Sequence, residues 1–383
     1  VQIRFWQASP ICIITEIPVW QRHFLKNAWK GRRRMNLQET IQKITELDRE
    51  AMERAQKRWN GIAHPLHSLG KLEDALVQIA GITGSDHIDL KKRALVVLCA
   101  DNGVVEEGVT QTGQEITLLV AENLVSGQAA SSIMSQVAKA DLVAVDVGIN
   151  NSCSLPDQKI AWGTKNLAKE PAMTREQAVA AIEVGIRTAE DLKEKGYQIL
   201  ATGEMGIGNT TTSSAIASVL LEKPVELMTG RGAGLSSAGL SKKVEVIKRA
   251  IALHKPDKAD ALDVLSKVGG FDLAGMAGVF LGGAALHMPV IIDGFISGVA
   301  ALVAAALCPS AREYMLASHK SKEPAAHLVL EALGKDPFLT CDMSLGEGTG
   351  AVTLFPLLDM ACAIYDRLGS FEEEKMEAYV PLD

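Results

Sequence analysis

Short, continuous apolar runs that alternate with helical patterns most constrain how this chain can fold. Five runs are typical of buried strands, at residues 94–100, 142–147, 198–202, 289–292 and 314–317. Around them, apolar residues recur with helical spacing at residues 36–60, 68–80, 115–137, 174–195, 211–222, 241–253, 273–286, 295–307 and 351–368. Fully apolar strands are buried on both faces, and helices between them connect parallel strands. The pattern predicts an α/β fold: a mostly parallel Rossmann-like sheet with helices on both faces.

The charge of the chain is unevenly distributed. The formal net charge is −7, but residues 1–34 hold seven basic residues and one acid, which leaves −13 on residues 35–383. An acidic body repels the phosphates of nucleic acids and anionic membranes. We therefore expect small-molecule partners, and any phosphate must be bound locally by backbone amides and a few cations.

The six cysteines form no Cys-x-x-Cys pair, which argues against a zinc site and against a disulfide scaffold. Reduced thiols in the cytoplasm are the expectation. Four of the eight histidines, at 64, 67, 287 and 319, also lack the spacing of metal ligands. The sequence thus predicts neither a metal nor a cofactor.

The segment 1–34 differs in composition from the rest of the chain. It holds three of the five tryptophans and the cluster Arg32-Arg33-Arg34, and Glu16 and Pro18 interrupt its apolar stretch, so it cannot span a bilayer. We expect a non-native or disordered extension, with the natural start at Met35. A membrane-surface or partner-binding arm is the alternative.

Polar and glycine-rich motifs follow the expected strands. Asp101-Asn102-Gly103 comes after the first strand, 203–211 after the third, 293–297 after the fourth and Ser318-His319 after the fifth. Ligands bind at the carboxyl ends of the strands in open α/β sheets. This consistent placement predicts an enzyme site at that edge.

The string 203–211 (GEMGIGNTT) has the features of a phosphate site. Its glycines expose backbone amides at the start of a helix, where an anion is favoured. A second loop, Gly230–Gly234, precedes Lys242 and Lys243, and a cation beside amide-rich loops suits a phosphate monoester. A tight turn followed by a capped helix is the alternative. The spacing fits neither a P-loop nor a dinucleotide fingerprint.

The string Ser344–Gly350 (SLGEGTG) places one acid, Glu347, among three glycines directly before a long helix-forming run. An acid held there is a candidate for proton transfer to or from a bound molecule. The alternative is a first-turn acid that complements the helix dipole. The chain shows no nucleophile elbow.

Taken together, these strings resemble the nicotinate-nucleotide:dimethylbenzimidazole phosphoribosyltransferase family, the enzymes that activate the lower ligand of cobalamin. The matching strings stand in family order, at residues 68–73, 99–109, 146–149, 203–211, 265–276, 293–297 and 345–351. The resemblance implies a homodimer that moves 5-phosphoribosyl from nicotinate mononucleotide to a base. Nicotinate leaves, and the product is an α-ribotide.

The resemblance also implies roles for residues. Glu347 would be the general base that takes the ring N–H proton of the incoming base. Donor phosphate and ribose would be bound by Glu204, Gly206, Gly208, Asn209, Thr210, Thr211, Gly232, Lys243, Ser297, Gly346 and Gly348. The acceptor base would lie against the segment 101–120, with Asp101, Thr112 and Val120.

Three departures from the family pattern bear on the acceptor and on activity. His64-Pro-Leu-His67 replaces Lys-Pro-Pro-Gly, Ser344 replaces an arginine, and Val120 stands where the family often has glutamine. Dimethylbenzimidazole, another benzimidazole, a purine or a phenol all stay open as the acceptor. So do a weakly active subunit that partners an active one and, as a rival class, a nucleotide-dependent oxidoreductase.

The resemblance further implies two domains after the extension that the composition predicts. Residues 1–34 are the extension, residues 35–93 and 352–383 form a small helical domain, and residues 94–351 form the large α/β catalytic domain.

Overall fold

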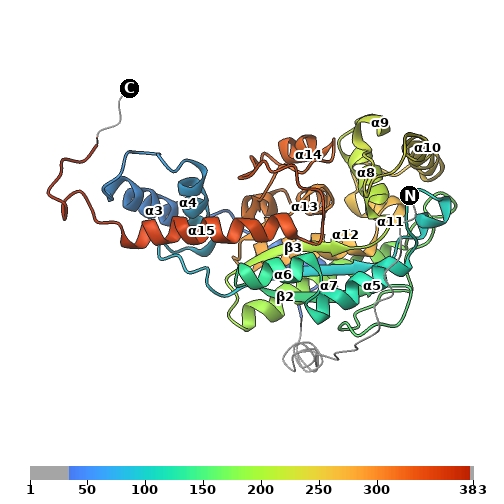
Figure 1. Ribbon diagram of the computed structural model, residues 1–383, viewed down its shortest axis with the longest axis horizontal. Helices are drawn as coiled ribbons and strands as arrows, with labels where there is room; N and C mark the ends of the chain where they lie inside the picture. Colours follow the sequence, from blue (N-terminus) through green and yellow to red (C-terminus); the bar gives the residue numbers. More distant parts are fainter. Residues whose placement is uncertain (1–33, 380–383) are drawn as a thin grey trace, which may run out of the picture.

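The computed structural model describes residues 34–379, and in this part of the chain five strands form one parallel sheet (Figure 1). The strand order is β2-β1-β3-β4-β5, and every neighbouring pair is parallel. The strands are β1 (Arg93–Ala100), β2 (Asp141–Gly148), β3 (Ile199–Met205), β4 (Val290–Ile292) and β5 (Met315–Ala317). All five apolar runs are therefore strands, and the α/β fold expected from the sequence is confirmed.

Helices cover both faces of the sheet. The side chains of β1 alternate between the two faces, so each face needs a cover of apolar residues. Val96 and Leu98 belong to one core, and Leu95 and Val97 to the other. The first core is built with α2 (Leu37–Lys43), α7 (Arg175–Glu194), α8 (Asn209–Leu220), α9 (Val225–Met228), α10 (Ser237–His254), α11 (Ala261–Val268), α12 (Phe271–Ala285), α13 (Phe295–Leu307) and α14 (Ala326–Ala332). The second is built with α3 (Arg49–Gly61), α4 (Lys71–Thr83), α5 (Glu115–Ser126), α6 (Ala130–Val137) and α15 (Thr349–Arg367). Two 3₁₀ helices, η1 (Gly103–Glu107) and η2 (Pro309–Tyr314), complete the described elements.

Glycines let α7 and α12 pack backbone against backbone. A Cβ on Gly185 would lie 1.9 Å from the carbonyl oxygen of Gly275, and a Cβ on Gly278 would lie 1.9 Å from that of Ile182. Every residue of α12 is buried between α7 and the sheet. The very apolar stretch from α12 to α13 is thus core, and within residues 34–379 no helix is both long and apolar enough to cross a bilayer.

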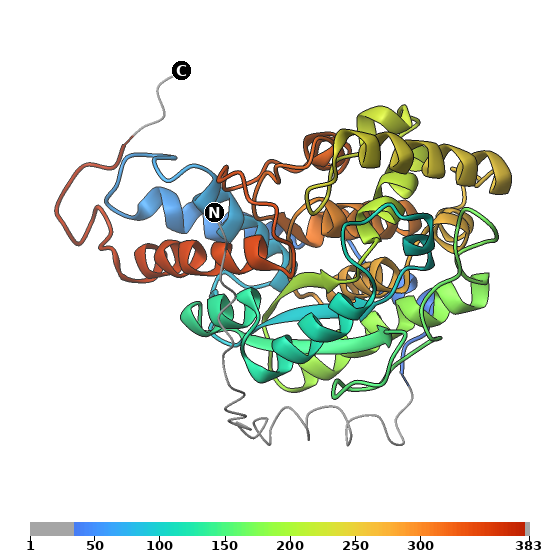
Figure 2. The same ribbon diagram turned by 45° about the vertical axis from the view of Figure 1, so that its right-hand side comes forward.

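Helices from the two ends of the described chain lie together at one end of the molecule. α3 and α4 pack on each other, and α4 packs on α15, beside the sheet (Figures 1 and 2). α2 instead packs on α7 and α12, with Leu37 in the first core. The division into a small domain (35–93 and 352–383) and a large one (94–351) stays a proposal. The expected extension lies outside the described residues, apart from Arg34.

Three helix expectations are corrected. Residues 36–60 form two helices because the chain is extended after Lys43 and Asp48 caps α3 afresh. Residues 115–137 also form two, since Gly127 adopts a left-handed conformation (φ 80°) that ends α5. α4 begins after Gly70 rather than at residue 68, and the Ser68 hydroxyl contacts the His64 ring at 3.1 Å. α9, α11 and α14 were not expected from the sequence.

Candidate active site

A pocket of about 240 Å³ lies at the carboxyl ends of β3, β4 and β5. Its lining comes from Val120 and from parts of the segments 204–210, 232–233, 293–297, 319–323 and 344–349. The expected strand-end motifs of β3, β4 and β5 therefore meet in one place.

Glu347 lies on a loop held tightly against the sheet. Gly346, Glu347 and Gly348 all have left-handed backbone, with φ of 89°, 58° and 83°. A Cβ on Gly203 of β3 would lie 2.6 Å from the carbonyl oxygen of Glu347, so only glycine there lets the loop approach. A left-handed glutamate costs of order 1–3 kcal/mol and persists only where its surroundings impose it.

The Glu347 carboxylate contacts helix α6. Its Oε2 accepts hydrogen bonds from the Ser131 hydroxyl at 3.0 Å and from the Ser131 backbone N–H at 3.2 Å. Ser131 is buried in the first turn of α6. An acid that lines the pocket is thus fixed from one side, which suits a group that exchanges a proton with a bound molecule.

Glu204 is the last-but-one residue of β3, so it belongs to the strand rather than to the loop after it. Its carboxylate accepts from the Asn209 side-chain amide, which also donates to Asp272 Oδ2 at 3.1 Å. Burial, and then the nearby Asp272 charge, raise the pKa of Glu204 well above its usual value. Burial likewise raises the pKa of Asp272 to about 6.

Residues 206–210 turn from β3 into α8. Gly206, Asn209 and Thr210 line the pocket, and Gly208 (φ 98°) caps the helix. The Asn209 and Thr211 backbone N–H groups donate to the carbonyls of Gly206 and Gly208 at 3.0 and 2.9 Å. Of the first three N–H groups of α8, that of Thr210 is therefore the one left, among the described residues, to face an anion. Gly232 faces the Thr210 hydroxyl, since a Cβ on it would lie 2.9 Å from Thr210 Oγ1.

Lys243 is fully buried behind this turn. Its ammonium donates to Thr210 Oγ1 at 2.8 Å and to the Gly230 carbonyl at 3.2 Å. Burial lowers the pKa of Lys243 to about 8, and the Glu323 charge opposes that shift. Lys243 is not part of the pocket lining, but Thr210, to which it donates, is.

The expected base Glu347 lines the pocket, and so do these residues of the expected donor site: Glu204, Gly206, Asn209, Thr210, Gly232, Ser297 and Gly346. Gly208, Thr211, Lys243 and Gly348 are not part of its lining. Ser297 is tied to the sheet, since its hydroxyl lies 2.7 Å from that of Thr202.

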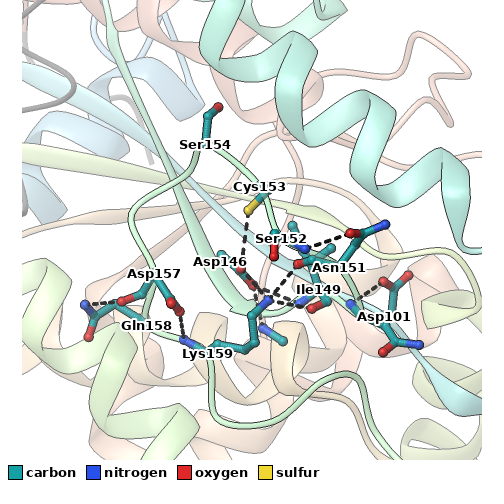
Figure 3. Close-up of polar contacts among 12 residues, drawn as sticks. Asp101, Asp146, Ile149, Asn151, Ser152, Cys153, Ser154, Asp157, Gln158 and Lys159 are labelled. Carbon is teal, nitrogen blue, oxygen red and sulfur yellow. Dashed lines mark hydrogen bonds and ion pairs between the residues drawn. The ribbon is translucent and has the colours of Figure 1, made fainter.

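Of the acceptor residues, only Val120 lines the pocket. Thr112 is exposed. The Asp101 carboxylate faces the loop after β2 and accepts from the Asn150 backbone N–H at 2.7 Å (Figure 3). Burial raises the pKa of Asp101. These contacts give Asp101 a loop-holding position.

Four further residues belong to this site although the sequence assigned them no role of their own. Asp293 and His319 line the pocket, and Asp293 Oδ1 accepts from the Ala351 backbone N–H at 2.9 Å, which fixes the start of α15 next to Glu347. Burial raises the pKa of Asp293, against the effect of His319. The positions of Asp293 and His319 just after β4 and β5 could have identified them from the sequence. No sequence feature marked Asp272 or Ser131, because only the fold brings α12 and α6 to this edge.

The family model described as phosphoribosyltransferase (DBI_PRT) matches residues 44–376, which include every part of this pocket. The chain belongs to this phosphoribosyltransferase family.

Two curated relatives of this chain bear the same enzyme name. The nicotinate-nucleotide–dimethylbenzimidazole phosphoribosyltransferase of Ruminiclostridium cellulolyticum is 48% identical over 352 residues, which is 91% of this chain and 100% of the relative. The protein of that name from Acetivibrio thermocellus is 46% identical, over 90% of this chain and 99% of its own length. The crystal structure of CobT from Thermus thermophilus superposes with a TM-score of 0.82 at 37% identity, covering 86% of this chain and 100% of that one.

No group of His, Cys, Asp and Glu side chains in residues 34–379 is arranged to hold a metal ion.

Proposed function

We propose that this phosphoribosyltransferase moves the 5-phosphoribosyl group of nicotinate mononucleotide to an aromatic base such as dimethylbenzimidazole. The products are an α-ribotide and nicotinate, for assembly of the cobalamin nucleotide loop. The observation that carries the proposal is the meeting of Glu347 with the β3–α8 turn in one pocket, in a chain whose relatives bear that enzyme's name.

The donor phosphate would bind at the β3–α8 turn. The Thr210 backbone N–H, in the first turn of α8, and the Thr210 hydroxyl supply donors, and Gly232 leaves room for a bulky anion. Lys243 donates to Thr210 and so fixes the direction of its hydroxyl. This anchor would place C1′ of the ribose near the loop that bears Glu347.

Glu347 would act on the incoming base. The ring nitrogen that bonds to C1′ must lose its proton, and Glu347 is the acid whose position Ser131 and the glycine loop fix. The pyridine nitrogen of nicotinate leaves neutral and needs no acid. One base and a phosphate anchor are sufficient for the reaction, and general-base assistance contributes about 10²–10⁴-fold.

The acceptor is expected to differ from that of relatives with a glutamine at position 120. Val120 and Ser344 both line the pocket, so both departures from the family pattern lie where they can contact a substrate. Without the amide, the wall presents an apolar side chain to the base. We expect Val120→Gln to raise kcat/KM for adenine relative to dimethylbenzimidazole, measured by competition between the two bases.

The decisive experiment incubates the protein with nicotinate mononucleotide and a panel of benzimidazoles, purines and phenols. Mass spectrometry should detect an α-ribotide, with nicotinate released in equal amount and only when a base is present. Donor binding without nicotinate release for any base would contradict the proposal and favour the partner-subunit alternative.

The protein is further proposed to act as a cytoplasmic homodimer, on the resemblance to the family. Sedimentation equilibrium of the purified chain should give twice the chain mass. A mass that changes only when a second, related chain is added would instead support a hetero-oligomer.

A further inference from the structure

Two buried carboxylates, Glu204 and Asp272, meet at the wall of the pocket without a basic partner among the described residues. Glu204 has 7% of its surface exposed and Asp272 has none. One amide nitrogen, Asn209 Nδ2, donates to Glu204 Oε2 and to Asp272 Oδ2. In the described chain, no basic side chain is ion-paired with either group. Two like charges this close and this dry do not both ionise at neutral pH.

The other contacts of the two acids indicate which one carries the charge and which one the proton. Asp272 Oδ1 accepts from the Leu273 backbone N–H at 2.9 Å, in the first turn of α12, where the helix dipole favours a negative charge. Asp272 also faces the Asn102 side chain. Glu204 lies at a strand end and faces the pocket. The surroundings thus favour the charge on Asp272 and the proton on Glu204.

We propose that Glu204 and Asp272 share one proton, so that Glu204 faces the bound mononucleotide as a neutral carboxylic acid while Asp272 and Asn209 position it. The substrate part of this inference rests on the proposed function. The donor carries a phosphate and a carboxylate, and a neutral Glu204 would repel neither of them. Glu204 then acts as a hydrogen-bond donor to the substrate rather than as a stabilising charge.

The other groups around Glu204 are consistent with this assignment. Asp293, after β4, adds a further negative charge, and His319 beside it offsets that charge in part. Cys99 of β1 is a buried thiol whose own pKa is raised by burial and then by the neighbouring carboxylates. The Glu347 backbone N–H donates to Glu204 and favours its ionised form, as does the Asn209 amide. Burial and the Asp272 charge act in the opposite direction and favour the protonated form of Glu204.

Infrared difference spectroscopy of the full chain tests the proton directly, without substrate. At pH 7 the wild type should show a protonated-carboxyl band that is absent from Glu204→Gln. In Asp272→Asn the band should disappear at lower pH than in the wild type, because the like charge that retains the proton is gone. The control Glu190→Gln changes a half-buried acid on α7 and should leave the band unchanged. No band at pH 7, or the same band in Glu204→Gln, would overturn the proposal.

A binding measurement tests the consequence. Affinity for nicotinate mononucleotide, measured by calorimetry, should fall by up to about tenfold per pH unit once Glu204 ionises. The pH at which the affinity begins to fall should be lower in Asp272→Asn, and Glu204→Gln should show no such fall. An unchanged pH for this fall in a folded Asp272→Asn protein contradicts the positioning role. If that variant does not fold, the wild type and Glu204→Gln spectra still decide. If no base is ever ribosylated, the band is unaffected, so the two proposals fail separately.

Discussion

A lysine side chain is largely or fully buried at each end of the carboxyl edge of the sheet, Lys159 at the β2 end and Lys243 at the pocket end. The two differ in whether a carboxylate pairs with the ammonium group. At the β2 end, Lys159 Nζ lies 2.6 Å from Asp146 Oδ2 and also donates to the backbone carbonyls of Ile149 and Asn151 (Figure 3). At the pocket end, Lys243 donates to a hydroxyl and a carbonyl, and within residues 34–379 no carboxylate lies at ion-pair distance.

Lys159 therefore carries a charge that holds the structure together, whereas Lys243 carries a charge that a ligand could still pair with. Removing charges from water costs several kcal/mol for each ion, and a close partner offsets much of that cost. The β2 end makes that pairing and uses it to hold the loop 149–163. At the pocket end, Lys243, Glu204 and Asp272 have no ion-pair partner within hydrogen-bonding reach among the described residues, and Glu323 acts on Lys243 only from farther away. This is the arrangement expected where a ligand completes the charge balance.

The largest expected effect is at the β2 end. Lys159→Met removes one partner of a buried ion pair and leaves Asp146 uncompensated, so the free energy of unfolding should fall by about 3–5 kcal/mol. Urea denaturation measures this change. The control Lys165→Met alters an exposed lysine of the next segment and should stay within about 0.5 kcal/mol. Equal stability of the two variants would remove the structural role of the pair.

At the pocket end the expected effect is on rate rather than stability. Glu347→Gln should retain the fold and donor binding but lower kcat by more than about 10²-fold, because the amide cannot take the proton. Steady-state kinetics and thermal denaturation measure both. Glu331→Gln, an exposed glutamate on α14, is the matched control. Near-normal turnover of Glu347→Gln would exclude it from the base role.

The buried Lys243 predicts a pH-dependent stability. Its pKa of about 8 is lower than the 10.5 of a free lysine, so the unfolded chain binds more protons between these values. The cost of burying the ammonium is therefore present below pH 8 and is relieved as the pH rises. Lys243→Met lacks that cost, and its stability advantage over the wild type should shrink above pH 8, by at most about 1.4 kcal/mol per pH unit.

Unfolding curves from pH 7 to 10 measure this difference. Lys242→Met changes the adjacent exposed lysine and should show no such trend. A difference between Lys243→Met and wild type that is constant with pH would mean that Lys243 stays charged through a partner.

The smallest expected effect is that of Ser131→Ala. The hydroxyl donates one hydrogen bond to Glu347, while the backbone N–H that donates the other is retained. The loss should be about 0.5–1.5 kcal/mol, or roughly 2–10-fold in kcat. Ser135→Ala is the control, since this buried hydroxyl of the same helix has no hydrogen-bond partner among the described residues. Equal kinetics of the two variants would leave Glu347 positioned by its loop alone.

Much of the fold was predictable because it depends on local pattern. Fully apolar runs became the five parallel strands, and the polar motifs after β3, β4 and β5 converged because parallel strands end at the same edge. Helix ends were less predictable. Gly127 and Asp48 redirect the chain within stretches whose apolar spacing continues.

The sequence by itself determined the layer order, the strand-end position of the pocket and the presence of Glu347, Glu204 and the glycine turns that bear them. Only the tertiary structure decided which groups these side chains meet. Ser131 reaches Glu347 across 216 residues of chain, and Asp272 joins Asn209 across 63. Local pattern encodes which face of an element is buried. The protonation state of an acid depends on neighbours that the packing of distant helices selects.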